Sequence, residues 1–277
     1  HLRFSVIVTR HGVRSPTGKA EQLNAYSHQP WPRWDVPAGY LTGQGRKLMA
    51  IFGAYDRAYF VQQGIFHADG CEDVEHVALY ADSDQRTRES ALALAAGAFP
   101  GCTPPPLHAL AEGTPDALFH PLSQARNLGD HDLAASAIAG RIGSDPGALT
   151  EAYRLQLELL QTILRGCEPH AACPPEDHPV ATQLIDVPSS LDAGKGDHLA
   201  DLKGPLSTAA TLTENLLLEF SSGLPADQVG WGKVTLSTLK QLIDLHTAAA
   251  DLTRRTPYLA RVQASGMMDR IVATLEQ

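Results

Sequence analysis

The 277-residue sequence lacks any run of about 18 apolar residues, so we expect no membrane-spanning helix. It also lacks an excess of basic residues, because 31 Asp and Glu outnumber 22 Lys and Arg for a formal net charge of −9. Nucleic-acid-binding domains need a basic patch or stripe. We therefore expect neither a membrane nor a nucleic acid as a partner.

Common cofactor and metal motifs are also absent. The Gly194, Lys195, Gly196 stretch lacks the spacing of a P-loop or a dinucleotide fingerprint, and no Gly-x-Ser-x-Gly elbow occurs. The four cysteines include no Cys-x-x-Cys pair, and none of the 12 histidines lie two, three or four residues apart. These spacings argue against a zinc site. We expect no metal and no cofactor.

The most informative segment of the chain places a histidine between two arginines. It reads Arg10, His11, Gly12, Val13, Arg14, Ser15, Pro16. Residues 4–9 before it are mostly β-branched or aromatic, which predicts a buried strand of an α/β sheet. The polar cluster would then lie at the carboxyl end of a strand, where open α/β sheets bind ligands.

These residue types are suited to phosphate chemistry. Two guanidiniums beside an imidazole can clamp a tetrahedral oxyanion, and phosphate is the favoured one. The imidazole would face phosphorus as a nucleophile. Nearby positive charge disfavours the imidazolium, so we expect Arg10 and Arg14 to lower the pKa of His11. The alternative is that these are ordinary surface or packed residues.

A second polar segment follows another expected strand, at residues 75–81. It runs through Asp82, Ser83, Asp84, Gln85, Arg86, Thr87, Arg88 and Glu89 into a helix at 90–98 rich in small residues. One interpretation makes Asp84 the N-cap of that helix and its neighbours solvated first-turn charges. That interpretation is compatible with Arg86 pointing inward.

The remaining pattern is largely helical. We predict a helix over residues 42–63, a Pro-rich loop at 100–106, and further helices at 130–139, 145–164, 205–221 and 236–252. A loop rich in Pro, Gly and charge separates the middle helices, at residues 167–204. The length predicts about two domains.

The heptad and the 82–87 stretch together resemble the histidine acid phosphatases, branch 2 of the histidine phosphatase superfamily. In that family the histidine becomes a phosphohistidine that water then hydrolyses. The resemblance implies that His11 is the nucleophile, that Arg10 and Arg14 clamp the phosphate, and that Arg86 completes the phosphate pocket. It places Asp82 near the substrate.

Other stretches resemble the bacterial periplasmic members, the phytases and glucose-1-phosphatases. They are residues 31–37, 41–42, 223–225, 230–232, 255–257 and 260–261. In that subgroup a helical glutamate and a later histidine line the substrate cleft, at places that match Glu214 and His246. Each of these two could also be an ordinary solvated or packed helical residue. Thr17 and Lys19 complete the expected substrate-binding set.

The relatives pair cysteines at similar places, which implies disulfides joining Cys71 to Cys102 and Cys167 to Cys173. Disulfides persist in oxidising compartments. We therefore expect a periplasmic or secreted protein.

The resemblance also implies a fold class: α/β, with a phosphoglycerate-mutase-like three-layer α/β/α domain and an inserted all-α domain. We assign residues 1–122 and 252–277 to the α/β domain, incomplete at its C-terminus, and residues 123–251 to the helical insert. The active site is expected between the two.

One departure concerns the proton donor. Family members continue past the helix matching residues 256–275 into a strand and a His-Asp motif, whose aspartate protonates the leaving alcohol. This sequence ends at Gln277, so we expect that motif on a C-terminal segment or a second chain. His131 and Asp132 also form a His-Asp pair, but they stand where a helix cap is expected.

The resulting hypothesis is an acid phosphatase that hydrolyses phosphomonoesters through a phosphohistidine and releases inorganic phosphate. Phytate (inositol hexakisphosphate) is the favoured substrate. The alternatives are a sugar-phosphate phosphatase of the glucose-1-phosphatase type, a mutase-like phosphoryl transferase, and a non-catalytic phosphate-binding module.

Overall fold

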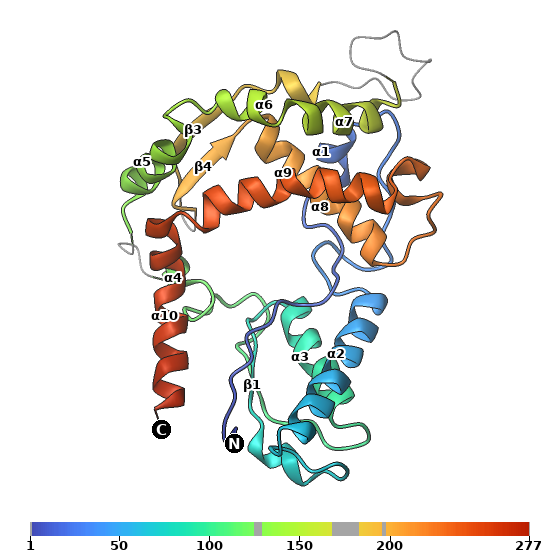
Figure 1. The fold of residues 1–277 in the computed structure, drawn as a ribbon, viewed down its shortest axis with the longest axis vertical. Helices are drawn as coiled ribbons and strands as arrows, with labels where there is room; N and C mark the ends of the chain where they lie inside the picture. Colours follow the sequence, from blue (N-terminus) through green and yellow to red (C-terminus); the bar gives the residue numbers. More distant parts are fainter. Residues whose placement is uncertain (1, 125–128, 168–182, 196–197, 277) are drawn as a thin grey trace. The chain divides into compact units, whose positions relative to one another are not determined.

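The computed structural model describes residues 2–124, 129–167, 183–195 and 198–276 (Figure 1). Its contacts divide the chain into two compact units. The first unit comprises residues 1–15, 34–124 and 266–277, and the second comprises residues 16–33 and 125–265. None of the described helices is both long and apolar enough to cross a bilayer.

The first unit is built around two helices that lie side by side (Figure 1). Its elements are α2 (Gly43–Gln62), the 3-10 helix η1 (Glu72–His76), β1 (Leu79–Tyr80), α3 (Gln85–Ala98), β2 (Leu107–His108) and α4 (Pro121–Gln124). The last turns of α10 (Pro257–Leu275), from Gly266 on, also belong to it. Strands β1 and β2 are parallel, with Leu79 opposite Leu107 and Tyr80 opposite His108.

Helix α2 buries one face at a spacing of three to four residues. That face consists of Gly45, Met49, Gly53, Arg57 and Phe60. The spacing is that of an amphipathic helix packed along one side. Thr42 caps the helix by accepting a hydrogen bond from the Gly45 N–H, so the helix predicted over residues 42–63 is confirmed.

Two glycines allow α2 and α3 to approach closely. A Cβ placed on Gly97 would lie 1.8 Å from the carbonyl oxygen of Ala50, and one placed on Gly53 would lie 1.9 Å from that of Leu94. No real side chain tolerates such distances. The two helix backbones are therefore in direct contact, and the position of α3 relative to α2 is fixed there.

The second unit is mostly helical. Its elements are α1 (Ala20–Asn24), α5 (His131–Ile142), α6 (Ala148–Ala152), α7 (Arg154–Arg165), η2 (Leu184–Asp186), β3 (Ser190–Ala193), β4 (Ala200–Lys203), α8 (Pro205–Ser221), η3 (Val229–Gly232), α9 (Leu236–Arg254) and the first turns of α10. Helices α8 and α9 pack against each other, and both carry fully buried leucines: Leu212, Leu216, Leu242 and Leu245.

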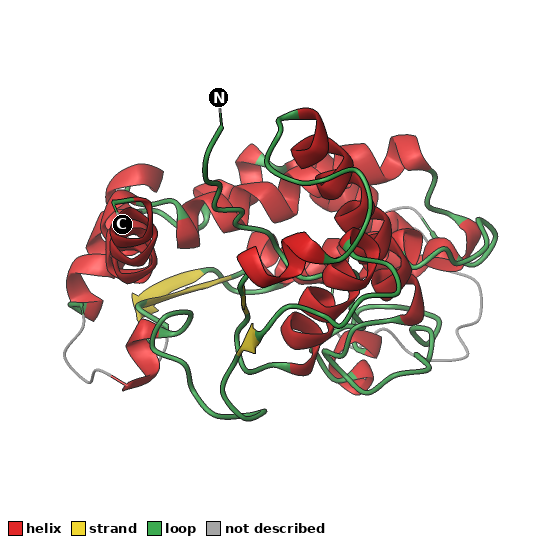
Figure 2. Cartoon of the chain, turned by 90° about the horizontal axis from the view of Figure 1, so that it is seen from below, coloured by secondary structure: helices red, strands yellow, loops and turns green. Residues whose placement is uncertain are grey.

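The predicted strand at residues 4–9 is wrong. In the part of the chain that the structure describes, no strand pairs with this segment, which is drawn as loop in Figure 2. Phe4 is 55% exposed and Val8 is 68% exposed. β-branched and aromatic residues favour a strand only where neighbouring strands supply hydrogen bonds and packing. The composition of residues 4–9 does not show whether such a neighbouring strand exists.

Three further predictions need correction. Only Leu79 and Tyr80 of the predicted strand at 75–81 are in a strand, because η1 extends to His76. The helix predicted at 145–164 is two helices, α6 and α7, which meet at Tyr153. The antiparallel pair β3–β4 lies within the predicted loop at 167–204.

A buried carboxyl joins α8 to η3 in the second unit. Glu219 of α8 is 1% exposed and accepts a hydrogen bond of 2.9 Å from the Gly230 N–H of η3. Gly230 and Trp231 both have left-handed backbone conformations, with φ of 52° and 57°. Burial raises the pKa of Glu219 to about 7, and the hydrogen bond from Gly230 opposes that shift.

Replacing Gly97 by Ala should destabilise the protein by about 2 kcal/mol or more, because the new methyl overlaps the α2 backbone. Gly140 of α5 is the matched control, since a Cβ there meets no atom within 4 Å. Gly140→Ala should instead stabilise the protein by about 0.5–1 kcal/mol. Urea denaturation of both variants tests this prediction. Equal effects of the two substitutions would contradict the close helix contact.

Glu219 should make the protein more stable in acid. Its folded-state pKa is raised from 4.5 to about 7, so its stabilising contribution is full below pH 4.5 and is lost as the pH rises through 7. The loss is on the order of 3 kcal/mol at most. Glu219→Gln should remove this part of the pH dependence of the unfolding free energy, whereas Glu75→Gln, at an exposed side chain, should not. Parallel pH profiles for the wild type and Glu219→Gln would rule out the effect.

Candidate active site

The arginine-flanked histidine segment is anchored to the start of α2. The Ser15 N–H donates to the Tyr40 carbonyl at 2.9 Å, and the Thr42 N–H donates to the Val13 carbonyl at 2.9 Å. The Thr42 hydroxyl donates to the same Val13 carbonyl at 3.0 Å. Thr42 thus caps α2 and holds the loop at the same time.

Glycines let the loop lie directly on α2. A Cβ on Gly45 would come within 2.1 Å of the Val13 carbonyl oxygen, and one on Gly12 would come within 2.8 Å of Met49 Cγ. The absence of a side chain at Gly12 and Gly45 thus permits the close approach of the loop to α2.

Ser90 connects the loop to α3. Its hydroxyl accepts a hydrogen bond of 2.9 Å from the Gly12 N–H and donates one of 2.6 Å to the Arg86 carbonyl. Ser90 is 4% exposed. One buried hydroxyl therefore fixes the backbone next to His11 and the backbone of Arg86.

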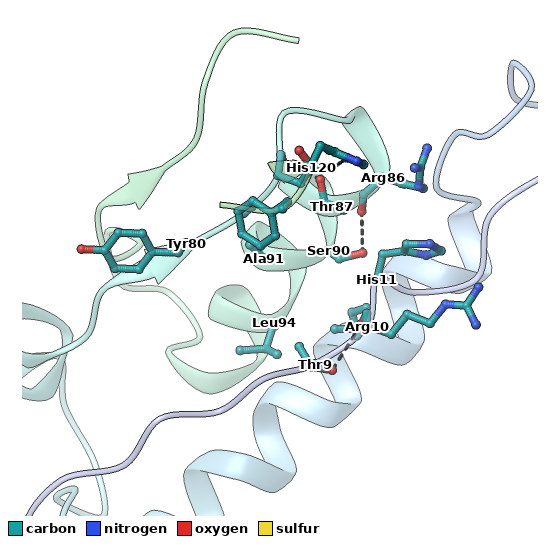
Figure 3. A pocket seen from close by; sticks show the side chains of 14 residues that line it. Thr9, Arg10, His11, Tyr80, Arg86, Thr87, Ser90, Ala91, Leu94 and His120 are labelled. Atoms are coloured by element: carbon teal, nitrogen blue, oxygen red, sulfur yellow. Dashed lines mark hydrogen bonds and ion pairs between the residues drawn. The ribbon is translucent and has the colours of Figure 1, made fainter. Parts of the chain in front are cut away.

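A cavity of about 320 Å³ opens beside this junction. Four segments line it: residues 9–11, Met49 of α2, residues between 80 and 94 in β1, α3 and the link that joins them, and residues 119–120. Figure 3 shows the side chains of Arg10, His11 and Arg86 extending toward the same region. The structure thus brings together the nucleophile and two of the three arginines expected from the sequence in one cavity wall.

The hydrogen bond of His11 determines which ring nitrogen can react. Its Nδ1 lies 2.8 Å from the Gly12 carbonyl oxygen. A carbonyl oxygen only accepts hydrogen bonds, so Nδ1 must carry the proton. In the neutral ring the lone pair is then on Nε2, and that nitrogen is the candidate nucleophile.

The surroundings of His11 favour its neutral form. Burial lowers its pKa most strongly, and the charges of Arg10, Arg86 and Arg14 lower it further. The hydrogen bond to Gly12 opposes these effects. A histidine with an ordinary pKa would be only roughly 3% neutral at pH 5. The lowered pKa therefore increases the fraction of His11 able to attack phosphorus in acid.

The three arginines are held in different ways. Arg14 is 7% exposed and donates to the Ser15 carbonyl at 3.0 Å. Arg86 forms an ion pair with Asp84, while its Nε is buried without a hydrogen-bond partner among the described residues. Arg10 lines the cavity at an exposed position. A buried, unpaired guanidinium N–H is a donor available to an oxyanion.

Asp84 stands at the N-cap position of α3, but its side chain makes no capping hydrogen bond. The interpretation that Asp84 is the N-cap residue is confirmed for its position, while its carboxylate pairs with Arg86. At α5 the cap is Asp130, whose side chain accepts from the Leu133 N–H. His131 and Asp132 follow it in the first turn of the helix.

Sequence reasoning missed His120. Its Nε2 lies 2.8 Å from Asp82 Oδ2, and both residues line the cavity. The two are 38 residues apart and His120 belongs to no motif, so no sequence signal joined them. Asp82, the expected substrate-side carboxylate, therefore has a histidine partner.

The other expected substrate-binding residues belong to the second unit. Thr17 and Lys19 are exposed, and Lys19 precedes α1. Glu214 lies on α8 and is partly buried. His246 lies on α9, with its Nδ1 3.2 Å from the Ala210 carbonyl oxygen. Their roles in substrate binding stay predictions.

The Cys71–Cys102 disulfide is present, as the resemblance implied. It joins the start of η1 to the loop that follows α3. Cys173 lies outside the described residues, so the pairing of Cys167 with Cys173 stays a prediction.

Replacing Ser90 by Ala should disturb the site through the backbone. It leaves the Gly12 N–H without its acceptor, which should cost about 1–3 kcal/mol of folding stability. Phosphate affinity should fall as well, because the same hydroxyl holds the backbone next to His11. Ser265→Ala is a matched control, since that exposed hydroxyl bonds only to a carbonyl of its own helix, at Arg261. Isothermal calorimetry with phosphate and urea denaturation are the measurements, and a Ser90→Ala protein equal to the control would contradict this role.

Comparison with known proteins agrees with this geometry. The family model "Histidine phosphatase superfamily (branch 2)" matches residues 1–277. The chain is 34% identical to phytase AppA of Escherichia coli (strain K12) over 277 residues, covering 99% of this chain and 63% of that protein. It is 30% identical to glucose-1-phosphatase of Salmonella typhimurium over 274 residues, covering 98% and 63%.

Solved structures give the same result. The Hafnia alvei phytase in complex with tartrate matches with a TM-score of 0.84 and 30% identity, over 96% of this chain and 64% of that one. The phytase from Citrobacter braakii matches with a TM-score of 0.83 and 32% identity, over 94% and 63%.

The chain thus spans less than two thirds of the length of these relatives. The fold class expected from the sequence, α/β with a helical domain, is confirmed by these matches. The family model extends over all residues, and the AppA match exceeds 30% identity over nearly the whole chain. The chain belongs to branch 2 of the histidine phosphatase superfamily.

Proposed function

We propose that this chain carries the nucleophile and phosphate clamp of an acid phosphatase that hydrolyses phosphomonoesters through a phosphohistidine. One observation carries the proposal: His11 holds its proton on Nδ1, so that Nε2 is left with a lone pair in a cavity wall that Arg10 and Arg86 share. The family membership and the resemblance to a phytase and a glucose-1-phosphatase support it.

In the proposed first step, the lone pair of His11 Nε2 forms a bond to phosphorus while the bond from phosphorus to the ester oxygen breaks. The leaving alkoxide takes up a proton from the solvent and departs as the alcohol. Arg10, Arg14 and Arg86 stabilise the charge on the phosphoryl oxygens. In the second step water attacks phosphorus, the P–N bond breaks, and inorganic phosphate is released as His11 returns to its neutral form.

Burial and the arginines fit this chemistry to acid conditions. Because they lower the pKa of His11, a larger fraction of this ring keeps its lone pair in acid than of an imidazole with an ordinary pKa. The same guanidiniums bind the phosphoryl oxygens, since Arg stays charged at all working pH values. Positive charge thus serves both the protonation state of the nucleophile and the binding of the substrate.

Phytate is the proposed substrate, in a site that also accepts smaller monoesters. The matches to phytases of Escherichia coli, Hafnia alvei and Citrobacter braakii support this choice. The matches to glucose-1-phosphatases of Salmonella typhimurium and Providencia rettgeri support a sugar phosphate as the second candidate. We propose that Asp82 contacts the substrate in the first unit and that Thr17, Lys19, Glu214 and His246 do so from the second.

We further propose that the protein works in the periplasm or outside the cell. The Cys71–Cys102 disulfide supports this location, because cytosolic thiols are kept reduced.

Steady-state kinetics near pH 5 test the proposal. We expect a higher kcat/KM for phytate than for glucose 1-phosphate, and His11→Ala should lower both by about 10³-fold or more. His76→Ala is the control, since that histidine is exposed and does not line the cavity. Activity retained by His11→Ala would overturn the nucleophile, and a strong preference for glucose 1-phosphate would overturn the choice of phytate.

A further inference from the structure

Trp231 of η3 lies in a backbone conformation that bulky residues rarely adopt. Gly230, Trp231 and Gly232 have φ angles of 52°, 57° and 77°, so three consecutive residues are left-handed. A residue with a Cβ is disfavoured in this region, and such strain persists only where the surrounding structure imposes it. The Gly230 N–H donates to Glu219 Oε2, and a Cβ on Gly230 would lie 2.3 Å from Val234 Cγ2. The residues around Trp231 therefore hold it in this conformation.

The indole of Trp231 contacts the segment at residues 28–31. Its Nε1–H donates to the Pro30 carbonyl at 3.1 Å. Its ring lies edge-on to the ring of Trp31, with centroids 5.0 Å apart, and edge-on to that of His28, with centroids 6.3 Å apart. Trp31 is 6% exposed, so this aromatic contact is largely buried. The left-handed turn thus brings one side chain of η3 against a segment that begins about 200 residues earlier in the chain.

The segment at residues 28–31 is also attached to α1. The Trp31 N–H donates to Asn24 Oδ1 at 3.0 Å, and Asn24 is the last residue of α1. Leu23, beside it, is 8% exposed and packs α1 into the second unit. The N-cap of α1 is Lys19, and the helix is only five residues long. A contact that holds the last residue of α1 therefore also restricts its first turn, where Lys19 lies.

The backbone before α1 has little support of its own. A Cβ on Gly18 would meet no atom within 4 Å, and Thr17 and Lys19 are exposed. The Lys19 side chain makes no capping hydrogen bond. The position of the Lys19 ammonium group therefore depends on α1 and, through the contacts above, on Trp231.

We propose that Trp231 is a positioning residue for polyanionic substrates: through residues 28–31 and α1 it holds Lys19 where the lysine binds anionic groups other than the reacting phosphoryl group. The inference rests on the proposed function, which assigns Lys19 to substrate binding and the reacting phosphoryl group to the first unit. An ammonium group binds such anions as a point charge. A substrate with a single phosphoryl group does not use this contact. Trp231 therefore affects KM for a polyphosphorylated substrate and leaves kcat unchanged.

Two anions that contain no phosphate ester test the proposal without turnover. Inorganic sulfate carries one anionic group for the proposed phosphate site of the first unit, whereas myo-inositol hexakissulfate carries several. Trp231→Phe keeps an aromatic ring against Trp31 but has no N–H for the Pro30 carbonyl. Calorimetry at pH 5 should show hexakissulfate binding weakened by about 3- to 10-fold and sulfate binding unchanged.

Asn24→Ala removes a second contact of the same series and leaves the aromatic rings in place. It should weaken hexakissulfate binding by a similar factor, and Lys19→Gln, which removes the charge, should weaken it at least as much. Adding Trp231→Phe to Lys19→Gln should weaken binding no further, because both substitutions act on one contact. Tyr258→Phe is the matched control, since it removes an aromatic side chain's hydrogen bond to the backbone elsewhere in the second unit, at the Asp130 N–H. It should bind both anions like the wild type.

Steady-state kinetics give a readout that a general loss of structure would not reproduce. Trp231→Phe should raise KM for phytate at pH 5 by the same factor as it weakens hexakissulfate binding, with kcat unchanged. Both constants for p-nitrophenyl phosphate should equal those of the wild type. A general structural defect would instead lower the turnover of both substrates.

The outcomes separate this inference from the proposed function. If Trp231→Phe weakens the binding of both anions by the same factor, or of neither, or if its effect adds to that of Lys19→Gln, the role of Trp231 is overturned while hydrolysis continues. Lys19→Gln that binds hexakissulfate like the wild type would overturn it as well. Anion binding as expected, by a protein that hydrolyses no phosphomonoester, would overturn the proposed function and support the role of Trp231. A wild type that binds neither anion would overturn both.

Discussion

The position of the side chains proposed to bind phosphate depends on the direct backbone contact between α2 and α3. Gly53 and Gly97 bring the two helices together, and Gly45 lets the His11 loop lie on α2 in the same way. Ser90 then ties the loop to α3 by a single hydroxyl. Side chains from distant parts of the sequence thus share one cavity because the helices that carry them cannot shift independently.

That arrangement has an electrostatic consequence. Concentrated positive charge would normally be destabilising, but here it has two uses. Together with burial, which is the larger cause, it lowers the pKa of His11 and so favours the neutral ring, and it provides donors for an oxyanion. Carboxylates lie beside these groups: Asp84 forms an ion pair with Arg86, and Asp82 accepts a hydrogen bond from His120. Acidic and basic groups in the site are thus matched locally, even though the chain as a whole carries a formal net charge of −9.

The sequence predicted the local features of this site well. The heptad around His11, the Asp82 to Thr87 stretch and helix α2 all follow from short-range residue patterns, and the structure places His11, Arg10 and Arg86 along one cavity. What failed depended on tertiary neighbours. Residues 4–9 have the composition of a strand, but strands are defined by partners that composition does not reveal. The Asp84 carboxylate forms an ion pair with Arg86 and makes no hydrogen bond to the helix end. His120 forms a hydrogen bond with Asp82, which lies 38 residues away in the sequence. The division of the chain into an α/β domain and a helical insert at the predicted boundaries stays a prediction.

The central claim is that His11 Nε2 accepts the phosphoryl group. Rapid mixing of the protein with a ³²P-labelled monoester, quenching in alkali and peptide mapping test it most directly, because a phosphoramidate survives base and is lost in acid. The account predicts label on the peptide that contains His11, lability of that label in acid, and no label in His11→Ala. Label on another residue, or turnover by the wild type with no labelled peptide at any quench time, would contradict it.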